Sequence, residues 1–427
     1  MGPQPPLRYR ASVQDWFSVI IGIGHDRTVR LVLELDGRVD QPRLAHALRI
    51  VRVAEPIIDC RFVPMPFSAH WRLREDRDTL ELCTLVETSN VKRDLDAFMA
   101  IPIDPMVDPL IQVRVFRAEN DTVCLKLSHA VMDGGGFKLL VERLTALYRA
   151  LATDPDSVIP PDLVTDRGQS QVMRLFSLTE RLRAFLTQPF HKKTWAFPYV
   201  GHDRTGVTFT VRTVDIPIAT LRAATKTRGA SITDAIVASF ARAFFEITEV
   251  PTGLRVPFTL AIDLRRYLAA PEAAGLVNLS SLTWIELERH SDFAPILADV
   301  HASLGAAMKD KPGVGLAMVM DIVSVMGYGI FHFANGIRAR MARAQGKEFP
   351  SLSNIGVMDP AVLDFGDAPV RDARFFPPVC YPPTFCIVSG SYKDRLYFSA
   401  SYPRGAVPGD MMERFLDCMV AQLDHLA

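Results

Sequence analysis

The chain has 427 residues, which is too long for one ordinary hydrophobic core, so we expect two lobes. Its 48 Lys and Arg residues balance 48 Asp and Glu residues, and this neutral balance without a long basic run argues against a nucleic-acid partner. The six cysteines are scattered and contain no Cys-x-x-Cys pair, which predicts reduced thiols and no metal site. The opening residues resemble no secretory signal, so we expect a cytoplasmic protein.

The first 150 residues alternate between strand and helix patterns. Apolar residues recur at every second position in the strand candidates and on one helical face in the helix candidates. A predicted hairpin over 111–127 leads the chain directly to His129. The other predicted elements are a strand over 31–35, a helix over 44–51, a strand over 58–62, a strand within 72–87 and a helix from 140 to 152.

A polar stretch, a basic amphipathic helix (172–186) and an irregular piece to 206 predict the connection between the lobes. In the second half, Ser231 and Asp234 have the spacing of a capping box before a helix. The pattern predicts an α+β protein with lobes over 1–170 and 207–427, joined by 171–206. The second lobe has strand candidates at 207–216, 258–262, 282–287, 385–389 and 396–401, and a closing helix over 412–423.

The segment Leu316–Ile337 is mostly apolar and is followed by three arginines, so its length and flank suit a membrane span. Asp321, His332 and Asn335 within it do not, because polar groups are costly in lipid. We therefore predict a buried or groove-lining helix. A weak peripheral contact with lipid and a wall for an oily substrate stay open as alternatives.

The most informative stretch is Ser128–Gly136, which lies between a strand pattern and a helix pattern. A histidine at such a corner can be presented into a cleft, and imidazole accepts protons near neutral pH. Asp133 is suited to a buried ion pair that holds the loop, and Gly134 and Gly135 let a substrate approach the backbone. The competing interpretation is a core histidine followed by a helix-capping aspartate.

Ser128-His129-Ala130-Val131-Met132-Asp133-Gly134 resembles the active-site motif of the CoA-dependent acyltransferase superfamily, which includes chloramphenicol acetyltransferase, plant BAHD acyltransferases, alcohol acetyltransferases, wax ester synthases and condensation domains. Three further segments resemble other motifs of this superfamily and occur in the same order along the chain. They are Asp263-Leu264-Arg265-Arg266 followed by Asn278, Ser353-Asn354-Ile355-Gly356, and Asp364-Phe365-Gly366.

Two departures narrow the resemblance. Many condensation domains and wax synthases begin the motif with two histidines, and here the first position is Ser128. The plant Asp-Phe-Gly-Trp-Gly motif is interrupted after Gly366 by Asp367 and Ala368. A stand-alone protein similar to the alcohol acetyltransferases fits best.

The resemblance implies two chloramphenicol acetyltransferase-like lobes with a tunnel between them. His129 would be the general base, and no acyl-enzyme would form. Asn354 would be a candidate oxyanion donor, with Ser353 beside it at the substrate, and Asp133 would pair with Arg265. The implied co-substrate is acyl-CoA or a phosphopantetheine thioester, the acceptor is a small alcohol or amine, and no cofactor is bound. A monomer is expected.

Two alternatives remain at this stage. The acyl group could be tethered to an acyl carrier protein, because CoA and the carrier's arm present the same terminal thioester. The chain could also be a non-catalytic protein that kept the fold, although the intact His129, Asp133 and Gly134 count against this.

Overall fold

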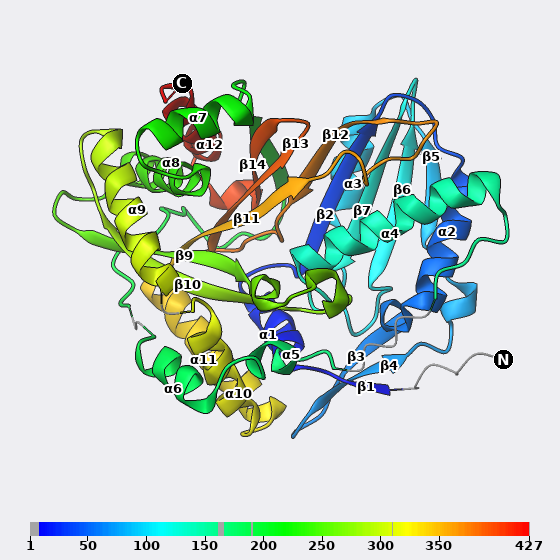
Figure 1. Cartoon of the computed structure of the whole chain (residues 1–427), viewed down its shortest axis with the longest axis horizontal. Helices are drawn as coiled ribbons and strands as arrows, with labels where there is room; N and C mark the ends of the chain where they lie inside the picture. Colours follow the sequence, from blue (N-terminus) through cyan, green and yellow to red (C-terminus); the bar gives the residue numbers. More distant parts are fainter. Residues whose placement is uncertain (1–7, 161–165, 189–190, 310, 427) are drawn as a thin grey trace.

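The computed structural model describes residues 8–160, 166–188, 191–309 and 311–426, so residues 1–7, on which the prediction of no signal rests, lie outside it. The chain is α+β, as the sequence predicted, and forms two lobes that each carry a mixed sheet flanked by helices (Figure 1).

The first lobe is built on a sheet with the order β12-β2-β7-β6-β5. The predicted hairpin is present as β6 and β7, which pair antiparallel. Helices α2 and α4 cover one face of this sheet, while α3 packs on the other. The elements are β2 (Thr28–Leu35), α2 (Gln41–Ala54), β5 (Cys83–Glu87), α3 (Val91–Ala100), β6 (Ile111–Arg117), β7 (Asp121–Ser128), α4 (Gly134–Thr153) and β12 (Val370–Phe376).

A smaller sheet with the order β1-β4-β3 lies below the first one in Figure 1. It joins the N-terminal strand to a hairpin whose tip is the turn Met65–Ser68. Its elements and their neighbours are β1 (Arg8–Arg10), α1 (Val13–Ile20), β3 (Cys60–Pro64) and β4 (Ala69–Leu73), with short 3-10 turns η1 (Ile21–Ile23), η2 (Pro56–Asp59) and η3 (Arg77–Thr79).

The second lobe has a sheet with the order β10-β9-β11-β13-β14-β8, and α8, α9 and α12 pack on one face of it. The predicted capping box is confirmed, because Ser231 Oγ accepts from the Asp234 amide and Asp234 Oδ2 from the Ser231 amide. The elements are β8 (Val207–Thr213), α7 (Ile218–Thr227), α8 (Ile232–Ile247), β9 (Arg255–Asp263), η4 (Leu264–Tyr267), η5 (Pro271–Ala274), β10 (Ser280–Glu288), α9 (Phe293–Lys309), β11 (Pro350–Met358), β13 (Phe385–Tyr392), β14 (Arg395–Pro403), η6 (Arg404–Ala406) and α12 (Met411–Asp424).

One strand departs from the predicted division of the chain at 207. Strand β12 belongs to the second half of the sequence, but it pairs antiparallel with β2 at the edge of the first lobe's sheet (Figure 1). The Phe375 amide donates to Tyr397 Oη at 3.0 Å, so β12 also bonds to the second sheet. The first lobe is therefore not confined to 1–170, because it takes one strand from the second half of the chain, and this strand ties the two sheets together.

The connection contains α5 (Ser170–Met173) and α6 (Leu178–Leu186), where one continuous helix was predicted. The apolar segment 316–337 also differs from the expected buried helix. It forms α10 (Val314–Ser324) and α11 (Tyr328–Gln345), bent by 120° at a short break. No single helix among the described residues is long and apolar enough to span a membrane, and only this bent pair passes that test jointly.

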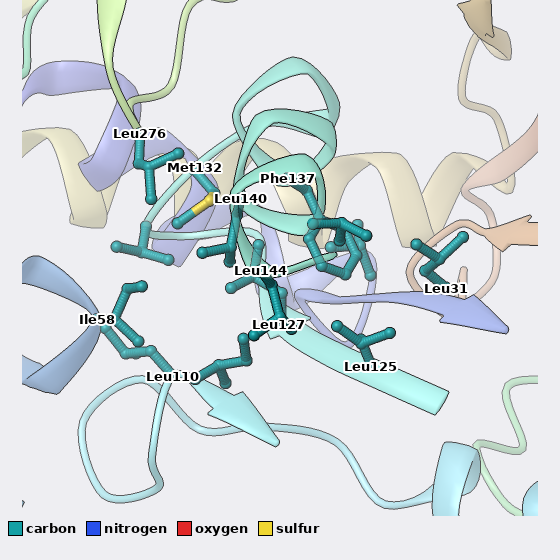
Figure 2. Close-up of a cluster of buried hydrophobic side chains, with 14 of the residues drawn as sticks. Leu31, Ile58, Leu110, Leu125, Leu127, Met132, Phe137, Leu140, Leu144 and Leu276 are labelled. Atoms are coloured by element: carbon teal, nitrogen blue, oxygen red, sulfur yellow. The ribbon is translucent and has the colours of Figure 1, made fainter. Parts of the chain in front are cut away.

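Apolar side chains between α4 and the first sheet fix the position of the motif loop. Leu140 and Leu144 of α4 point toward Leu125 and Leu127 of β7 (Figure 2). Met132, inside the motif, belongs to the same buried cluster. Packing on both sides of the corner therefore holds the loop between β7 and α4 in one position.

Lys126 is a cation buried inside this lobe. Its Nζ lies 2.9 Å from the Ile101 carbonyl and 4.0 Å from the Phe98 ring centroid. Burial, with the nearby charge of Arg30, lowers the pKa of Lys126 to about 8. A lysine whose pKa is lower in the folded state destabilises the fold while it is charged, below that pKa, and this cost fades as the pH rises toward the unfolded value.

We therefore expect Lys126→Met to raise the free energy of unfolding by about 1–3 kcal/mol at pH 7, allowing for the lost hydrogen bond. Thermal unfolding between pH 7 and pH 10 measures it, and the gain should shrink as the pH rises. The exposed Lys92→Met is the control. A gain that stays constant with pH would contradict burial of the charge as its cause.

Candidate functional site

The motif loop joins the end of β7 to the start of α4, as its sequence pattern predicted. Asp133 is the N-cap of α4, because its Oδ1 accepts from the Gly136 amide at 2.9 Å. The three glycines that follow form the first turn of this helix. Asp133 is thus a capping aspartate, as the competing interpretation had it, and it also makes the ion pair described below.

The ring of His129 is oriented by its own loop. Its Nδ1 lies 3.2 Å from the Met132 carbonyl oxygen. A carbonyl only accepts hydrogen bonds, so this contact places the ring proton on Nδ1 and leaves the lone pair on Nε2. A fixed ring with a free Nε2 lone pair is what a general base requires.

The backbone of the loop is held by groups from outside it. The His129 amide donates to the Arg27 carbonyl at 2.7 Å, and Asn278 Nδ2 donates to the His129 carbonyl at 3.0 Å. Arg167 donates to the Val131 carbonyl through Nη2 and to the Leu276 carbonyl, at 3.0 Å, through Nη1. The carbonyls of 129, 131 and 132 therefore all have partners, and the loop is preorganised.

Arg265 and Asp133 form the ion pair that the motifs implied. Arg265 Nη1 donates to both carboxylate oxygens of Asp133 at 2.8 Å, and the two side chains are only 8% and 4% exposed. Asp133 Oδ2 also accepts from the Leu279 amide at 2.6 Å, and Arg265 Nη2 donates to the Val277 carbonyl at 2.8 Å. Burial alone would lower the pKa of Arg265, but the Asp133 carboxylate outweighs this and raises it.

The motif glycines were expected to leave room for a substrate, and the structure shows what a side chain at each of them would contact. A Cβ on Gly135 would lie 2.9 Å from Arg265 Nη1, and one on Gly136 would lie 3.0 Å from Met132 Cβ and 3.2 Å from the Val277 carbonyl oxygen. Gly135 therefore lets the helix pack closely on the ion pair, and Gly136 lets it pack closely on the motif loop and on the Val277 backbone. A Cβ on Gly134 would meet only Ile355 Cγ2, at 3.7 Å, so the structure leaves room at Gly134 alone of the three.

Strand β11 brings Ser353 and Asn354 to the start of α4. Lys138 of α4 donates to the Ile355 and Val357 carbonyls, which holds this irregular part of β11 against the helix. The Asn354 side chain is exposed, and its Oδ1 accepts from the Gly356 amide at 2.9 Å. Its oxygen thus belongs to a local turn, and its Nδ2 is the atom that could still serve as a donor.

Asp364 has a structural role in this fold, bonding within its own turn and to α4. Its Oδ1 accepts from the Gly366 amide at 2.9 Å, and its carbonyl accepts from Arg149 Nη1 of α4 at 2.5 Å. Phe365 is buried and packs edge-on against Tyr148 of the same helix. This segment therefore anchors the chain that leads to β12.

A second histidine lies close to His129 and was not identified from the sequence. His25 Nδ1 accepts from the Arg27 amide at 3.1 Å, which places its proton on Nε2. Burial, with the nearby charges of His129 and Arg27, lowers the pKa of His25 to about 3. His25 is therefore a neutral donor near neutral pH. Its separation from the motif by 104 positions in sequence left no signal for it.

The described residues offer no group of His, Cys, Asp or Glu that could hold a metal ion. All six cysteines fall within the described ranges and are free thiols. Burial raises the pKa of Cys60 and Cys124 to about 12 and that of Cys83 to about 11, so these thiols stay protonated near neutral pH. Protonated, buried thiols are poor nucleophiles.

A cavity of about 470 Å³ opens at the junction of the first lobe, the connection and α11. It is lined by Gly22, Pro382 and three basic side chains, His202, Arg204 and Arg343. Arg204 and Arg343 line the same cavity, and burial together with the positive charge of Arg204 lowers the pKa of Arg343. The sequence gives no signal for this basic cavity, because its residues come from four segments that are far apart in the chain.

A scan against models of protein families finds no match, and a search of curated protein sequences finds none either. Solved structures do match over nearly the whole chain. Polyketide synthase associated protein 5 from Mycobacterium tuberculosis is 14% identical, with a TM-score of 0.66 and 100% coverage of both chains. Trichothecene 15-O-acetyltransferase from Fusarium sporotrichioides is 13% identical, with a TM-score of 0.70 and coverage of 98% of this chain and 95% of that one.

The first condensation domain of the CDA synthetase is 18% identical, with a TM-score of 0.66 and coverage of 98% and 97%. At these identities the likeness establishes the fold. The chain has the two-lobed fold of CoA-dependent acyltransferases and condensation domains, which confirms the resemblance drawn from the motifs at the level of fold.

Proposed function

We propose that this protein transfers an acyl group from a thioester donor to an alcohol or amine acceptor, with His129 as general base. The observation that carries the proposal is the orientation of His129, whose Nδ1 is bonded within a loop clamped from both lobes while its Nε2 keeps a lone pair. A histidine buried only for packing would not need such an arrangement.

In the proposed reaction, His129 Nε2 takes the proton from the acceptor's hydroxyl or amine as that group attacks the thioester carbonyl. The carbon–sulfur bond then breaks, and the same proton goes to the leaving thiolate. The products are an ester or amide and a free thiol, so atoms and charges balance without an acyl-enzyme. Direct transfer requires Nε2 within about 3 Å of the acceptor atom.

The tetrahedral intermediate carries an oxyanion that needs a hydrogen-bond donor. Asn354 Nδ2 and His25 Nε2 are the two candidates. His25 has its tautomer fixed by the Arg27 amide and stays neutral, so it can donate without competing for the proton that His129 carries. Asn354 lies on the strand held against α4.

The basic cavity supports a donor with phosphate groups. Both CoA and the phosphopantetheine arm of a carrier protein carry phosphate at the end remote from the thioester. Paired guanidinium groups bind phosphate well because they donate in a planar fork. The cavity includes Gly22, whose neighbour in space is the Arg27 side chain, and the Arg27 carbonyl accepts from the His129 amide.

The test is thiol release from acetyl-CoA and long-chain acyl-CoAs, and from acyl carrier protein, against a panel of alcohols and amines. We expect turnover with at least one donor and acceptor. Arg343→Gln should raise KM for the phosphate-bearing donor roughly tenfold, the cost of one charge-assisted hydrogen bond, with little change in kcat.

The donor acyl-N-acetylcysteamine has a thioester but no phosphate, so it separates phosphate binding from acyl transfer in this test. Its KM should be the same for Arg343→Gln and the wild type, and the exposed Arg222→Gln should behave as the wild type with every donor. Equal losses with both donors would contradict the phosphate site while leaving acyl transfer intact. Absence of thiol release with all donors would contradict the proposed function.

A further inference from the structure

The outer face of α11 is apolar, the reverse of an ordinary surface helix. Helical spacing places Ile330, Phe333, Ile337 and Met341 on one side, and their exposed fractions are 56%, 69%, 43% and 56%. The side chains that face the protein are Tyr328, Phe331 and Ala342. Apolar residues thus occupy both faces, and only one face is covered.

The apolar face continues beyond α11. In the break between α10 and α11, Val325 is 86% exposed and Met326 48%. The tip of the β3–β4 hairpin packs on this break, because the Gly329 amide donates to the Pro66 carbonyl at 2.8 Å. Phe67 at that tip is 85% exposed. We call these exposed residues of α11, the break and the hairpin tip the apolar edge.

The charge around the apolar edge is positive although the whole chain is balanced. Helix α11 contains Arg338, Arg340 and Arg343 and no acidic residue, and the β3–β4 hairpin contains Arg61 and Arg72. Glu348 pairs with Arg338 and Glu75 with Arg72, so the excess positive charge comes from the other arginines. Asp321 of α10 is the one acidic residue of these three elements. In Figure 1, α10 lies at the lower margin of the molecule and α11 rises from it beside α6.

We propose that the apolar edge docks on the surface of a phospholipid bilayer that contains anionic lipid. A helix that turns large apolar side chains outward and carries basic residues fits the interface, where apolar groups enter the acyl boundary and arginines meet headgroup phosphates. A contiguous exposed apolar patch of this kind marks an interaction surface. The positive charge selects the anionic bilayer among the surfaces that could cover it.

The edge does not depend on the catalytic proposal, because none of the groups assigned to the reaction lies on it, except that Arg343 also lines the basic cavity. The variants below therefore leave Arg343 in place. Lipid binding and acyl transfer can each fail while the other succeeds.

The experiment is co-sedimentation of the full chain with vesicles of phosphatidylcholine, with and without phosphatidylglycerol, at low and high salt. We expect the wild type to bind the phosphatidylglycerol vesicles and to be released by salt. Phe333→Ser should lower the partition coefficient roughly tenfold or more, since a phenylalanine side chain would leave an apolar medium. Arg340→Gln should weaken binding only to the anionic vesicles.

Matched controls are Val53→Ser, an exposed apolar residue of α2 with 73% exposure, and Arg222→Gln on α7. Both should bind as the wild type, and the melting temperatures of all variants should agree. Equal binding of Phe333→Ser and the wild type, or no binding of the wild type, would overturn the proposal. So would a dimer in solution that Phe333→Ser converts to a monomer, because a second copy would then be the occupant of the edge.

Discussion

The His129→Ala variant should fold like the wild type and lose about 10²- to 10⁴-fold in kcat for acyl transfer, the range that general-base catalysis supplies. Folding should be retained because the His129 side chain is half-buried and its Nδ1 bonds to the Met132 carbonyl of the same loop. The backbone bonds from Arg27 and Asn278 do not depend on the imidazole.

Steady-state thiol release and calorimetry measure this outcome. His46→Ala is the matched control, because His46 is also half-buried, lies in the same lobe and has its Nδ1 3.3 Å from Nη1 of neighbouring Arg49. Turnover within a few-fold of the wild type would remove the general-base role from His129. A large fall in melting temperature would instead indicate that the ring is structural, and the loss of activity would then be indirect.

The local elements of the fold followed from the sequence because their signals are local. Alternating apolar residues fix which side of a strand is buried, so β6 and β7 were predicted as a hairpin and are one. The same alternation in β12 does not say which sheet the strand joins. Its pairing with β2 depends on contacts across more than 300 positions of chain. The domain boundary at 207 was therefore drawn without this strand.

The apolar segment 316–337 shows a different limit. Hydropathy measures how apolar a stretch is, and it does not say whether the side chains face a core or solvent. Gly327, with a φ of 87°, lies at the break that divides the stretch into two helices. One buried or groove-lining helix was predicted, and the segment forms two helices instead, with Phe331 buried and Phe333 exposed.

The sequence predicted the motif residues of the candidate site, but it did not predict the residues that surround them. Asp133 and Arg265 could be paired because the resemblance supplied both halves. His25, Arg167 and the basic cavity depend on how distant segments meet, which a single sequence does not reveal. Gly135 was read as room for a substrate because a glycine in sequence does not show what its missing Cβ would touch, and here that is Arg265.

The Asp133–Arg265 pair should control stability more than rate. Asp133→Ala removes the carboxylate that meets Arg265 Nη1, the Leu279 amide and the Gly136 amide, and it leaves the buried guanidinium with only its longer contact to a carboxylate, Asp263 Oδ1 at 3.3 Å. Breaking a buried pair in this way costs about 3–5 kcal/mol, so we expect the free energy of unfolding to fall by that amount. Because the pair joins the motif loop to η4 of the second lobe, part of the loss should appear as loosening between the lobes.

Chemical denaturation of Asp133→Ala, Arg265→Met and the double variant measures the coupling. We expect the double variant to be more stable than Asp133→Ala, because it buries no unpaired charge. Asp133→Asn keeps one carbonyl oxygen, which can replace the acceptor of the Gly136 amide or of the Leu279 amide but not both, and it should be intermediate. Asp410→Ala, which breaks the exposed pair with Arg414, should change stability little.

The comparison of rate with stability decides the role of Asp133. A positioning residue lowers kcat only as far as it disturbs the loop, so kcat of the Asp133 variants should recover together with stability in the double variant. If Asp133→Asn kept the wild-type melting temperature while kcat fell as steeply as in His129→Ala, Asp133 would have to act on the reacting groups. The ion pair would then not explain why an aspartate stands four residues after the catalytic histidine.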